Sequence, residues 1–287
     1  MSEASFIYLN GEFISSHQPS LYINNRAFRY GDGVFESMRA IGTTVPFLQM
    51  HIERLRKGVA FMEMELPESL TNVYIEKQIT HLLNANKHFN GARIRLGVFR
   101  KEGGNFLPIT NKTEYYIEST PTNTNNFQLN TKGILIDIFS DYTKPVVAFN
   151  QLKSINSHLY IKAALHAQSR NLDDCLILNE HKRIIEATSS NIFICSNNNL
   201  ITPSLSEGCL PGIMREIIIQ LALKEKITVY DDVCLNEKDL TDADEIFLTN
   251  AVSGITWVVA FRNRRYFSKI AKKLTLALNE HANMVNS

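Results

Sequence analysis

Two charged residues in the second half of the chain, Lys153 and Glu186, are candidates for catalytic side chains. Lys153 lies in the run AFNQLKSIN, between a strand-like segment and a predicted helix, and is flanked by Leu152 and Ile155. Partial desolvation at such a junction favours the neutral amine, which is a nucleophile. Glu186 lies in the run RIIEATSSNIF, and a carboxylate held at a strand end can pair with a protonated ring nitrogen. The simpler alternatives are a solvated lysine at a helix start and an acid on a surface turn.

A second set of residues could bind an anion such as a phosphate. The run LPGIMR, residues 210–215, predicts the start of a helix, where unpaired backbone N–H groups and the helix dipole favour negative charge. Thr249 and Asn250 follow at the end of a predicted strand, and both side chains can form hydrogen bonds to a phosphate. Arg54 could clamp a phosphate with its guanidinium. Many helices begin this way with nothing bound, and Arg54 could equally be an exposed helical residue.

Composition excludes several other classes of protein. The 287 residues include 30 Lys+Arg and 29 Asp+Glu, for a net charge of +1, so no basic surface for nucleic acid or an anionic membrane is expected. No stretch approaches the ~20 apolar residues of a membrane span, and the first residues, MSEASF, lack the basic and apolar regions of a secretory leader. The four cysteines show no C-x-x-C spacing, and no metal site is expected. A cytoplasmic protein is therefore expected.

The elements that must position these residues mix strands and helices without a regular βαβ alternation, which favours an α+β fold. Asn10-Gly11 between two apolar runs predicts a type I′ hairpin. Further strands are expected near residues 34–41, 92–100, 115–118, 133–139, 175–178, 191–195, 228–233 and 245–248, and helices near 51–64, 70–86, 156–170, 212–224 and 268–281. A polar, turn-rich run begins at Thr120. We therefore expect a smaller N-terminal domain at 1–120, a linker at 121–131 and a larger C-terminal domain at 132–287.

Six fragments, taken in order, resemble the pyridoxal-phosphate enzymes of fold type IV, the class IV aminotransferases. They are FRYGDGVFE (28–36), HIERL (51–55), KSIN (153–156), ExxxSNIF (186–193), LPGIMR (210–215) and TNA (249–251). The resemblance implies the two-domain α+β architecture of D-amino-acid aminotransferase-like enzymes, with pyridoxal 5'-phosphate as the cofactor. It also implies a small-molecule substrate and a homodimer whose site lies near the interface.

The resemblance implies a role for each matching residue. Lys153 looks like the lysine that holds the cofactor as a Schiff base and moves protons at the substrate Cα, and Glu186 looks like the partner of the pyridine nitrogen. The other residues that resemble cofactor contacts, most of them in the phosphate cup, are Arg54, Asn191, Ile213, Met214, Thr249 and Asn250. Met214 stands where many aminotransferases carry Thr, so this position and Ile213 would contribute only backbone N–H groups.

Three arginines of the run ARIRLGVFR, residues 92–100, are candidates for gripping the substrate's carboxylates. Side chains alternate along a strand, so Arg93 and Arg95 share one face and Arg100 lies on the other. Position in the motif favours Arg95, and Arg100 is the second candidate. Tyr30 is a candidate wall of the substrate pocket, with a core tyrosine as the alternative.

Three activities compete within the family. The fragments KSIN and GDG resemble D-amino-acid aminotransferases and aminodeoxychorismate lyases, whereas GIMR and TNAVSGI look closest to the lyase. We therefore expect a 4-amino-4-deoxychorismate lyase, which would form 4-aminobenzoate and pyruvate for folate synthesis, although Asn105 stands where the lyase pattern often has Arg. The alternative is an amino-acid aminotransferase of the D-amino-acid or branched-chain type. A non-catalytic binding protein comes third, because Lys153 and Glu186 are both present.

Overall fold

The structure is a computed structural model that describes residues 5–18 and 21–285. The first four residues, which enter the expectation about a leader, lie outside the described residues. The chain divides into two compact units: unit 1 comprises residues 1–126, 153–156 and 282–287, and unit 2 comprises residues 127–152 and 157–281. The first division falls between residues 126 and 127, and the expected domain bounds stay a prediction. The segment Lys153–Asn156, however, belongs to unit 1 and not to the C-terminal part of the chain that surrounds it in sequence.

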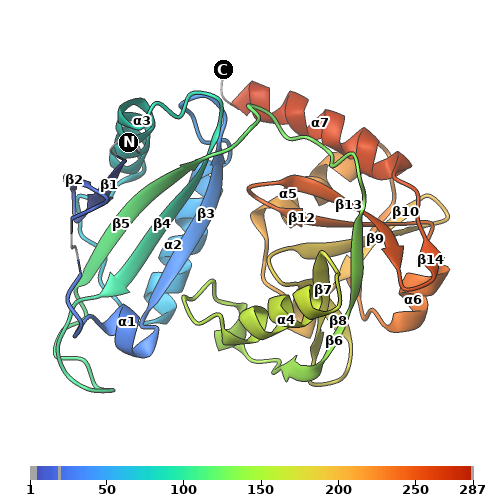
Figure 1. The fold of residues 1–287 in the computed structure, drawn as a ribbon, viewed down its shortest axis with the longest axis horizontal. Coiled ribbons are helices and arrows are strands. Elements are labelled where there is room, and N and C mark those ends of the chain that lie inside the picture. Colours follow the sequence, from blue (N-terminus) through green and yellow to red (C-terminus); the bar gives the residue numbers. More distant parts are fainter. Residues whose placement is uncertain (1–4, 19–20, 286–287) are drawn as a thin grey trace. The chain divides into compact units, whose positions relative to one another are not determined.

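Unit 1 contains one antiparallel sheet with the strand order β2-β1-β5-β4-β3 (Figure 1). Its strands are β1 (Phe6–Leu9), β2 (Glu12–Ser15), β3 (Gly33–Ala40), β4 (Ala92–Arg100) and β5 (Thr113–Pro121). Asn10 and Gly11 join β1 to β2 with φ angles of 53° and 88°. Positive φ at both positions is what a type I′ turn requires, so the predicted hairpin is present.

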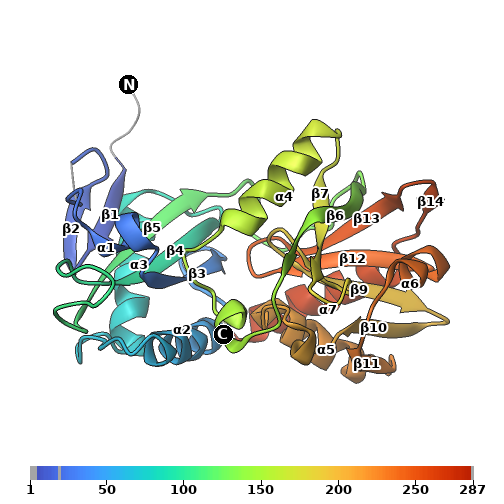
Figure 2. The ribbon, with the colours of Figure 1, turned by 90° about the horizontal axis from the view of Figure 1, so that it is seen from below.

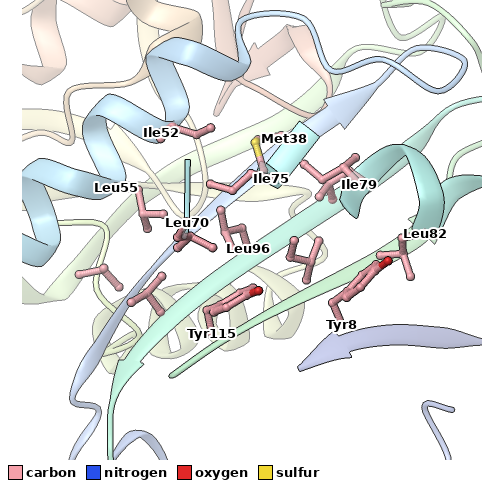
Figure 3. Close-up of a cluster of buried hydrophobic side chains, with 14 of the residues drawn as sticks. Tyr8, Met38, Ile52, Leu55, Leu70, Ile75, Ile79, Leu82, Leu96 and Tyr115 are labelled. Carbon is pink, nitrogen blue, oxygen red and sulfur yellow. The ribbon is translucent and has the colours of Figure 1, made fainter. Parts of the chain in front are cut away.

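Helices cover one face of this sheet (Figure 2). They are α2 (Leu48–Phe61) and α3 (Asn72–Ala85), while the short α1 (Arg26–Tyr30) precedes β3. Figure 3 shows the buried side chains that join the helices to the strands, among them Met38, Ile52, Ile79 and Leu96. Burial of each such side chain stabilises the unit by about 1.5–3 kcal/mol. Because side chains alternate along a strand, the neighbouring residues of β3, β4 and β5 lie on the opposite face.

Unit 2 is built around a mixed sheet whose strands follow the order β11-β10-β9-β12-β13-β6-β7-β8. The strands are β6 (Ile134–Lys144), β7 (Asp174–Asn179), β8 (Ile184–Ala187), β9 (Asn191–Ser196), β10 (Asn199–Pro203), β11 (Val229–Val233), β12 (Glu245–Asn250), β13 (Gly254–Phe261) and β14 (Arg264–Arg265). β8 also pairs with β9, at Glu186 and Asn191. This pair closes β9, β12, β13, β6, β7 and β8 into a ring, so the sheet forms a small barrel around an apolar core.

The helices of unit 2 lie around this barrel (Figure 2). They are α4 (His158–Ser169), α5 (Ile213–Lys224), α6 (Glu237–Asp242) and α7 (Lys269–Val285), with short 3-10 turns at Ala148–Gln151 and Leu205–Glu207. α4 packs on β6 and β7, and α5 packs on β11 and β12. Within residues 5–18 and 21–285, no helix has the length and apolar character needed to cross a membrane.

The α+β fold class is confirmed, and the longer predicted elements are present. The sequence analysis missed α1, α6, β8, β10, β13 and β14. β8, which carries Glu186, has only four residues. All four are buried, so this strand shows no alternation between apolar and polar positions that could reveal it.

Candidate active site

Three of the predicted cofactor-binding residues lie in one row across the sheet of unit 2. Glu186 on β8 pairs with Asn191 on β9, and Asn191 pairs with Thr249 on β12. Paired residues of antiparallel strands point to the same side of the sheet. Neighbouring strands lie about 4.8 Å apart, so the row spans about 10 Å. It therefore holds a carboxylate and a hydroxyl at a fixed separation.

Glu186 is held by three hydrogen bonds. Its Oε1 accepts from Nζ of Lys144 at 2.7 Å and from the hydroxyl of Tyr160 at 2.8 Å, and its Oε2 accepts from the N–H of Leu210 at 2.8 Å. Burial and the adjacent charge of Glu186 raise the pKa of Tyr160, so this hydroxyl stays protonated and donates. A carboxylate offers about four lone-pair positions. The three bonds therefore leave room for one more donor, as pairing with a ring nitrogen requires.

Helix α5 begins with backbone N–H groups that no side chain caps. Its N-cap residue is Gly212, and no side chain of the described residues makes a cap bond there. The side chains of Ile213 and Met214 carry no hydrogen-bond donor, so these two residues offer only their backbone N–H groups. Such a helix start is suited to bind an anion.

Thr249 provides an independent sign that a ligand binds to this part of unit 2. The residue is 1% exposed, and its hydroxyl has no hydrogen-bond partner among the described residues. A buried hydroxyl without a partner costs about 1–3 kcal/mol. A phosphate at this position would accept the missing bond, so the residues present fit the phosphate group of the expected cofactor.

Asn250 forms the turn that follows β12. Its Oδ1 accepts from the N–H groups of Val252 at 3.0 Å and Ser253 at 2.8 Å, and its Nδ2 donates to the hydroxyl of Ser190 at 3.0 Å. The side chain thereby joins the β12–β13 turn to the β8–β9 turn. A direct contact between Asn250 and the cofactor stays a prediction.

Lys153 is attached to the sheet of unit 1 through its backbone. Its carbonyl accepts from the N–H of Phe35 at 2.9 Å, and the N–H of Ile155 donates to the carbonyl of Gly33 at 3.1 Å. The segment around Lys153 therefore pairs with the edge strand β3. A Cβ at position 33 would lie 2.7 Å from the carbonyl oxygen of Val98 and 2.9 Å from Cδ1 of Ile155. Gly33 is thus needed for the close approach of this segment.

The side chain of Lys153 lies beside the face of β3 and β4 that α2 and α3 leave uncovered. Its Nζ lies 4.6 Å from the centre of the Phe35 ring, and the guanidinium of Arg95 lies 3.8 Å from the same ring. Nε of Arg95 also donates to the hydroxyl of Tyr116 at 2.8 Å. This face combines an amine, a guanidinium and two aromatic rings, so it can hold both the carboxylate and the apolar part of a small substrate.

Arg54 belongs to a buried cluster on the other side of β3. Its Nε and one terminal nitrogen donate to the two carboxylate oxygens of Glu36 at 2.7 and 2.6 Å, and Nδ1 of His51 lies 2.7 Å from the same carboxylate. Burial by itself would raise the pKa of Glu36, but the charge of Arg54 and the hydrogen bonds outweigh it and lower the pKa to about 2. Burial lowers the pKa of His51, which is therefore neutral at pH 7. The cluster fixes the orientation of the Arg54 guanidinium.

The guanidinium of Arg100 is occupied by groups of unit 1, and a contact between Arg100 and the substrate stays a prediction. Its Nε donates to Asp32 at 3.0 Å, one terminal nitrogen donates to the carbonyl of Met62 at 2.7 Å, and the other contacts Asn111. The side chain is 7% exposed. Its donors bind loops of unit 1, so Arg95 is left as the arginine of β4 beside Lys153.

Tyr30 lies at the end of α1 against an exposed apolar loop. Its ring is 37% exposed and lies 5.6 Å from the ring of Phe106. The buried Arg26 donates to the carbonyls of Gly103 and Asn105 at 3.0 and 2.6 Å and thereby shapes this loop. A contact between Tyr30 and the substrate stays a prediction.

The structure places the predicted residues in two groups, one in each unit. Glu186, Asn191, Ile213, Met214, Thr249 and Asn250 lie in unit 2, and Tyr30, Arg54, Arg95, Arg100 and Lys153 lie in unit 1. The sequence analysis missed Lys144, Tyr160 and Glu36. Lys144 and Tyr160 act on a partner far along the chain, and no motif or periodicity singles them out. Glu36 ends the fragment FRYGDGVFE, but the fragment does not reveal that its carboxylate binds Arg54.

Comparisons with known proteins identify the family of this chain. Residues 33–261 match the family described as Amino-transferase class IV. Over 277 residues the chain is 31% identical to a protein of Methanocaldococcus jannaschii named "Putative branched-chain-amino-acid aminotransferase", covering 96% of this chain and 94% of that protein.

Solved structures show the same fold. A branched-chain aminotransferase from the archaeon Thermoproteus uzoniensis, solved with norvaline, superposes with a TM-score of 0.87 at 24% identity, covering 98% of this chain and 95% of that one. A protein of Legionella pneumophila described as "Putative 4-amino-4-deoxychorismate lyase" gives a TM-score of 0.82 at 26% identity, covering 93% and 97%. Both activities expected from the sequence therefore occur among the names of its structural neighbours.

Proposed function

The chain belongs to the class IV aminotransferases, and on this premise we propose that it is an amino-acid aminotransferase of the branched-chain type. Enzymes of this family use pyridoxal 5'-phosphate, so the expected cofactor and enzyme class are confirmed. The expected lyase becomes the second candidate, because two curated relatives that match 96% of this chain are named branched-chain aminotransferases. The observation that carries the proposal is the face beside Lys153, where one guanidinium lies among aromatic rings.

In this proposal each residue has a distinct task. The bound cofactor supplies the electron sink that stabilises negative charge at the substrate Cα. Lys153 holds the cofactor and moves a proton to and from that carbon. Glu186 accepts the N–H of the ring nitrogen, while Lys144 and Tyr160 hold the carboxylate in place.

The phosphate is assigned to the start of α5 and to two side chains. Backbone N–H groups of Ile213 and Met214 and the hydroxyl of Thr249 would donate to it from unit 2. The sequence resemblance also assigns phosphate binding to Arg54, whose guanidinium is oriented by Glu36 within unit 1.

The substrate is assigned to the face of β3 and β4 next to Lys153. Arg95 would pair with a carboxylate, and the rings of Phe35 and Tyr116 would contact an apolar side chain. A Cβ at position 97 would lie 2.2 Å from Cε1 of Tyr116, so Gly97 allows this ring to lie flat on the sheet. The half-buried Arg95 lies among aromatic rings, which suits an amino acid with an uncharged side chain.

A substrate panel tests the proposal. Purified protein with pyridoxal 5'-phosphate and 2-oxoglutarate would be assayed with L-leucine, L-valine, L-isoleucine, D-alanine and aminodeoxychorismate. We expect amino transfer from the three branched-chain amino acids. Replacement Arg95→Gln should raise KM for an amino donor or acceptor at least tenfold, whereas Arg93→Gln, at an exposed position of the same strand, should leave it unchanged. Pyruvate release from aminodeoxychorismate without amino transfer would overturn the proposal.

The lyase is kept as the second candidate on a specific observation. The protein of Legionella pneumophila described as a lyase shares 26% identity over nearly the whole chain. Both reactions require Lys153 and Glu186, so the products decide between them: pyruvate and 4-aminobenzoate for the lyase, a new amino acid for the aminotransferase.

A homodimer in the cytoplasm completes the proposal. The loop at residues 106–109 of unit 1 exposes three large apolar side chains, Phe106, Leu107 and Ile109, which are 89, 83 and 77% exposed. Exposed apolar surface of this kind marks an interaction site, and a second copy is the occupant that the family suggests. All four cysteines are free thiols, which suits a reducing compartment. Light scattering of the purified protein at micromolar concentration should give the mass of a dimer, and a monomer would contradict the proposal.

A further inference from the structure

The segment Leu210–Gly212 contacts two neighbouring members of the residue row in unit 2, Glu186 and Asn191. The N–H of Leu210 donates to Oε2 of Glu186 at 2.8 Å, and Nδ2 of Asn191 donates to the carbonyl of Leu210 at 2.8 Å. Both backbone polar groups of Leu210 are therefore bound by neighbouring members of the row. The position of this segment is set by the same two residues that close the barrel.

Gly212 extends this link to helix α5. A Cβ at position 212 would lie 1.9 Å from Oδ1 of Asn191 and 3.1 Å from its Cγ. Real Cβ atoms do not approach other atoms so closely, and the amide of Asn191 is fixed by its bond to Leu210. Because Gly212 is the N-cap of α5, its contact with Asn191 determines where the first N–H groups of the helix stand relative to Glu186.

The side chain of Asn191 is thus occupied by the protein. The residue is 5% exposed, its Nδ2 binds Leu210, and its Oδ1 packs against the backbone of Gly212. A second role as a cofactor contact, which the sequence motif implied, is not needed to explain why an asparagine stands there. Its position in the row, between Glu186 and Thr249, is suited to hold both at a fixed separation.

We propose that Asn191 is a positioning residue that fixes the phosphate-binding start of α5 relative to the carboxylate of Glu186. This inference rests on the proposed function only in that the cofactor binds with its ring nitrogen at Glu186 and its phosphate at α5. A ligand binds more tightly when its ring nitrogen and its phosphate are separated by the distance between Glu186 and the start of α5. Asn191 therefore contributes to selection of pyridoxal 5'-phosphate over pyridoxal, which lacks the phosphate.

Equilibrium binding to the apo protein tests this role without any measurement of turnover. Absorbance titrations would give the affinities of wild type, Asn191→Ala and the control Asn199→Ala for pyridoxal 5'-phosphate and for pyridoxal. We expect Asn191→Ala to weaken binding of the phosphorylated ligand about tenfold or more and binding of pyridoxal less than threefold. Asn199, on β10 and outside the row, should leave both affinities unchanged. Equal losses for the two ligands, or no loss, would overturn the inference.

A double-mutant cycle tests the contact with Gly212 itself. In the wild-type background, Gly212→Ala should lower the melting temperature of the apo protein and the affinity for pyridoxal 5'-phosphate, because the new methyl group meets Asn191. In the Asn191→Ala background, the same change should cost much less in both measurements, because Oδ1 has gone. Additive losses would contradict the contact.

The two experiments also separate this inference from the proposed reaction. A wild-type protein that prefers pyridoxal 5'-phosphate but transfers no amino group would overturn the aminotransferase assignment alone. An Asn191→Ala protein with wild-type ligand preference would overturn the positioning role alone. A wild-type protein that binds pyridoxal 5'-phosphate and pyridoxal equally well would also overturn the positioning role, because Asn191 could then not contribute to a preference for the phosphorylated ligand.

Discussion

Lys144 and Lys153 lie close together in the sequence and are held in opposite ways. Lys144 is buried in unit 2, and its ammonium donates to Glu186 at 2.7 Å. Lys153 is half-buried in unit 1, where hydrogen bonds of its backbone segment fix it to β3 and its ammonium lies over the ring of Phe35. A lysine that supplies a permanent charge benefits from a tight ion pair. A lysine that must exchange a proton and a covalent partner is better positioned through its backbone, which leaves the side chain able to change partners.

Removal of the reactive amine should have the largest effect. Lys153→Ala is expected to lower the rate of amino transfer by about 10⁴-fold, because no other group can move the proton at the substrate Cα. The melting temperature should change little, because the backbone bonds to β3 remain. Steady-state assays and thermal unfolding would measure the two effects, with the exposed Lys57→Ala as a control. A variant that kept a tenth of the activity would refute the assignment of Lys153.

Removal of the structural lysine should act on stability first. Lys144→Met leaves the buried Glu186 without its cation, so we expect the free energy of unfolding to fall by about 3–5 kcal/mol. The double variant Lys144→Met/Glu186→Leu should recover part of this loss, since apolar side chains can replace a buried ion pair. Urea unfolding of the apo protein would measure both. If the free energy of unfolding fell by less than about 1 kcal/mol in the single variant, the Lys144–Glu186 ion pair would be no stronger than a surface ion pair, and the prediction would be wrong.

Glu36 is a buried carboxylate of unit 1 whose contribution to stability should depend on pH in the acid range. Its pKa is about 2 in the folded protein against an ordinary value of 4.5, which corresponds to about 3 kcal/mol of stability at neutral pH. A lowered pKa stabilises above the unfolded value, so this contribution should be lost as the pH falls from about 4.5 towards 2. The Glu36→Gln variant should lack this pH-dependent loss of stability. The control variant Glu53→Gln, on the exposed side of α2, should show the same loss as wild type. The free energy of unfolding would be measured as a function of pH across this range. If wild type and Glu36→Gln lost stability in parallel as the pH falls, the lowered pKa would not belong to Glu36.

The smallest effect is expected at Thr249, the one member of the row whose side chain has no partner among the described residues. Thr249→Val should leave the apo protein as stable or slightly more stable, because a buried unpaired hydroxyl is removed. The affinity for pyridoxal 5'-phosphate should fall about five- to tenfold, and Thr249→Ser should restore it. Thermal unfolding and absorbance titration would show both effects. A Val variant that bound the cofactor as tightly as wild type would remove Thr249 from the phosphate site.

The sequence predicts local features of this fold well. Strand β4 begins and ends where the alternation of ARIRLGVFR places it, and Asn10-Gly11 forms its hairpin. Alternation also places Arg95 and Arg100 on opposite faces. It does not reveal that Arg100 is buried among carbonyl groups, because those carbonyls belong to loops that the strand meets only in the folded unit.

The parts of the site that sequence analysis could not predict depend on distant partners. Lys144 meets Glu186 across 42 positions, and Tyr160 meets it across 26. Neither separation leaves a local pattern, since the contact depends on the closure of the barrel. The motif ExxxSNIF identifies Asn191 but gives no sign of the proposed positioning role. That role depends on the contact between Asn191 and the backbone of Gly212, 21 positions further along the chain.

The pairing of the Lys153 segment with β3 also affects how much of the edge of the unit 1 sheet is open to other chains. β3 is the edge strand of its sheet, and an unpaired edge is a template on which another chain can add a strand. Residues 153–155 occupy this edge at Gly33 and Phe35. The segment that carries Lys153, the proposed reactive lysine, therefore also covers part of the edge on which another chain could add a strand.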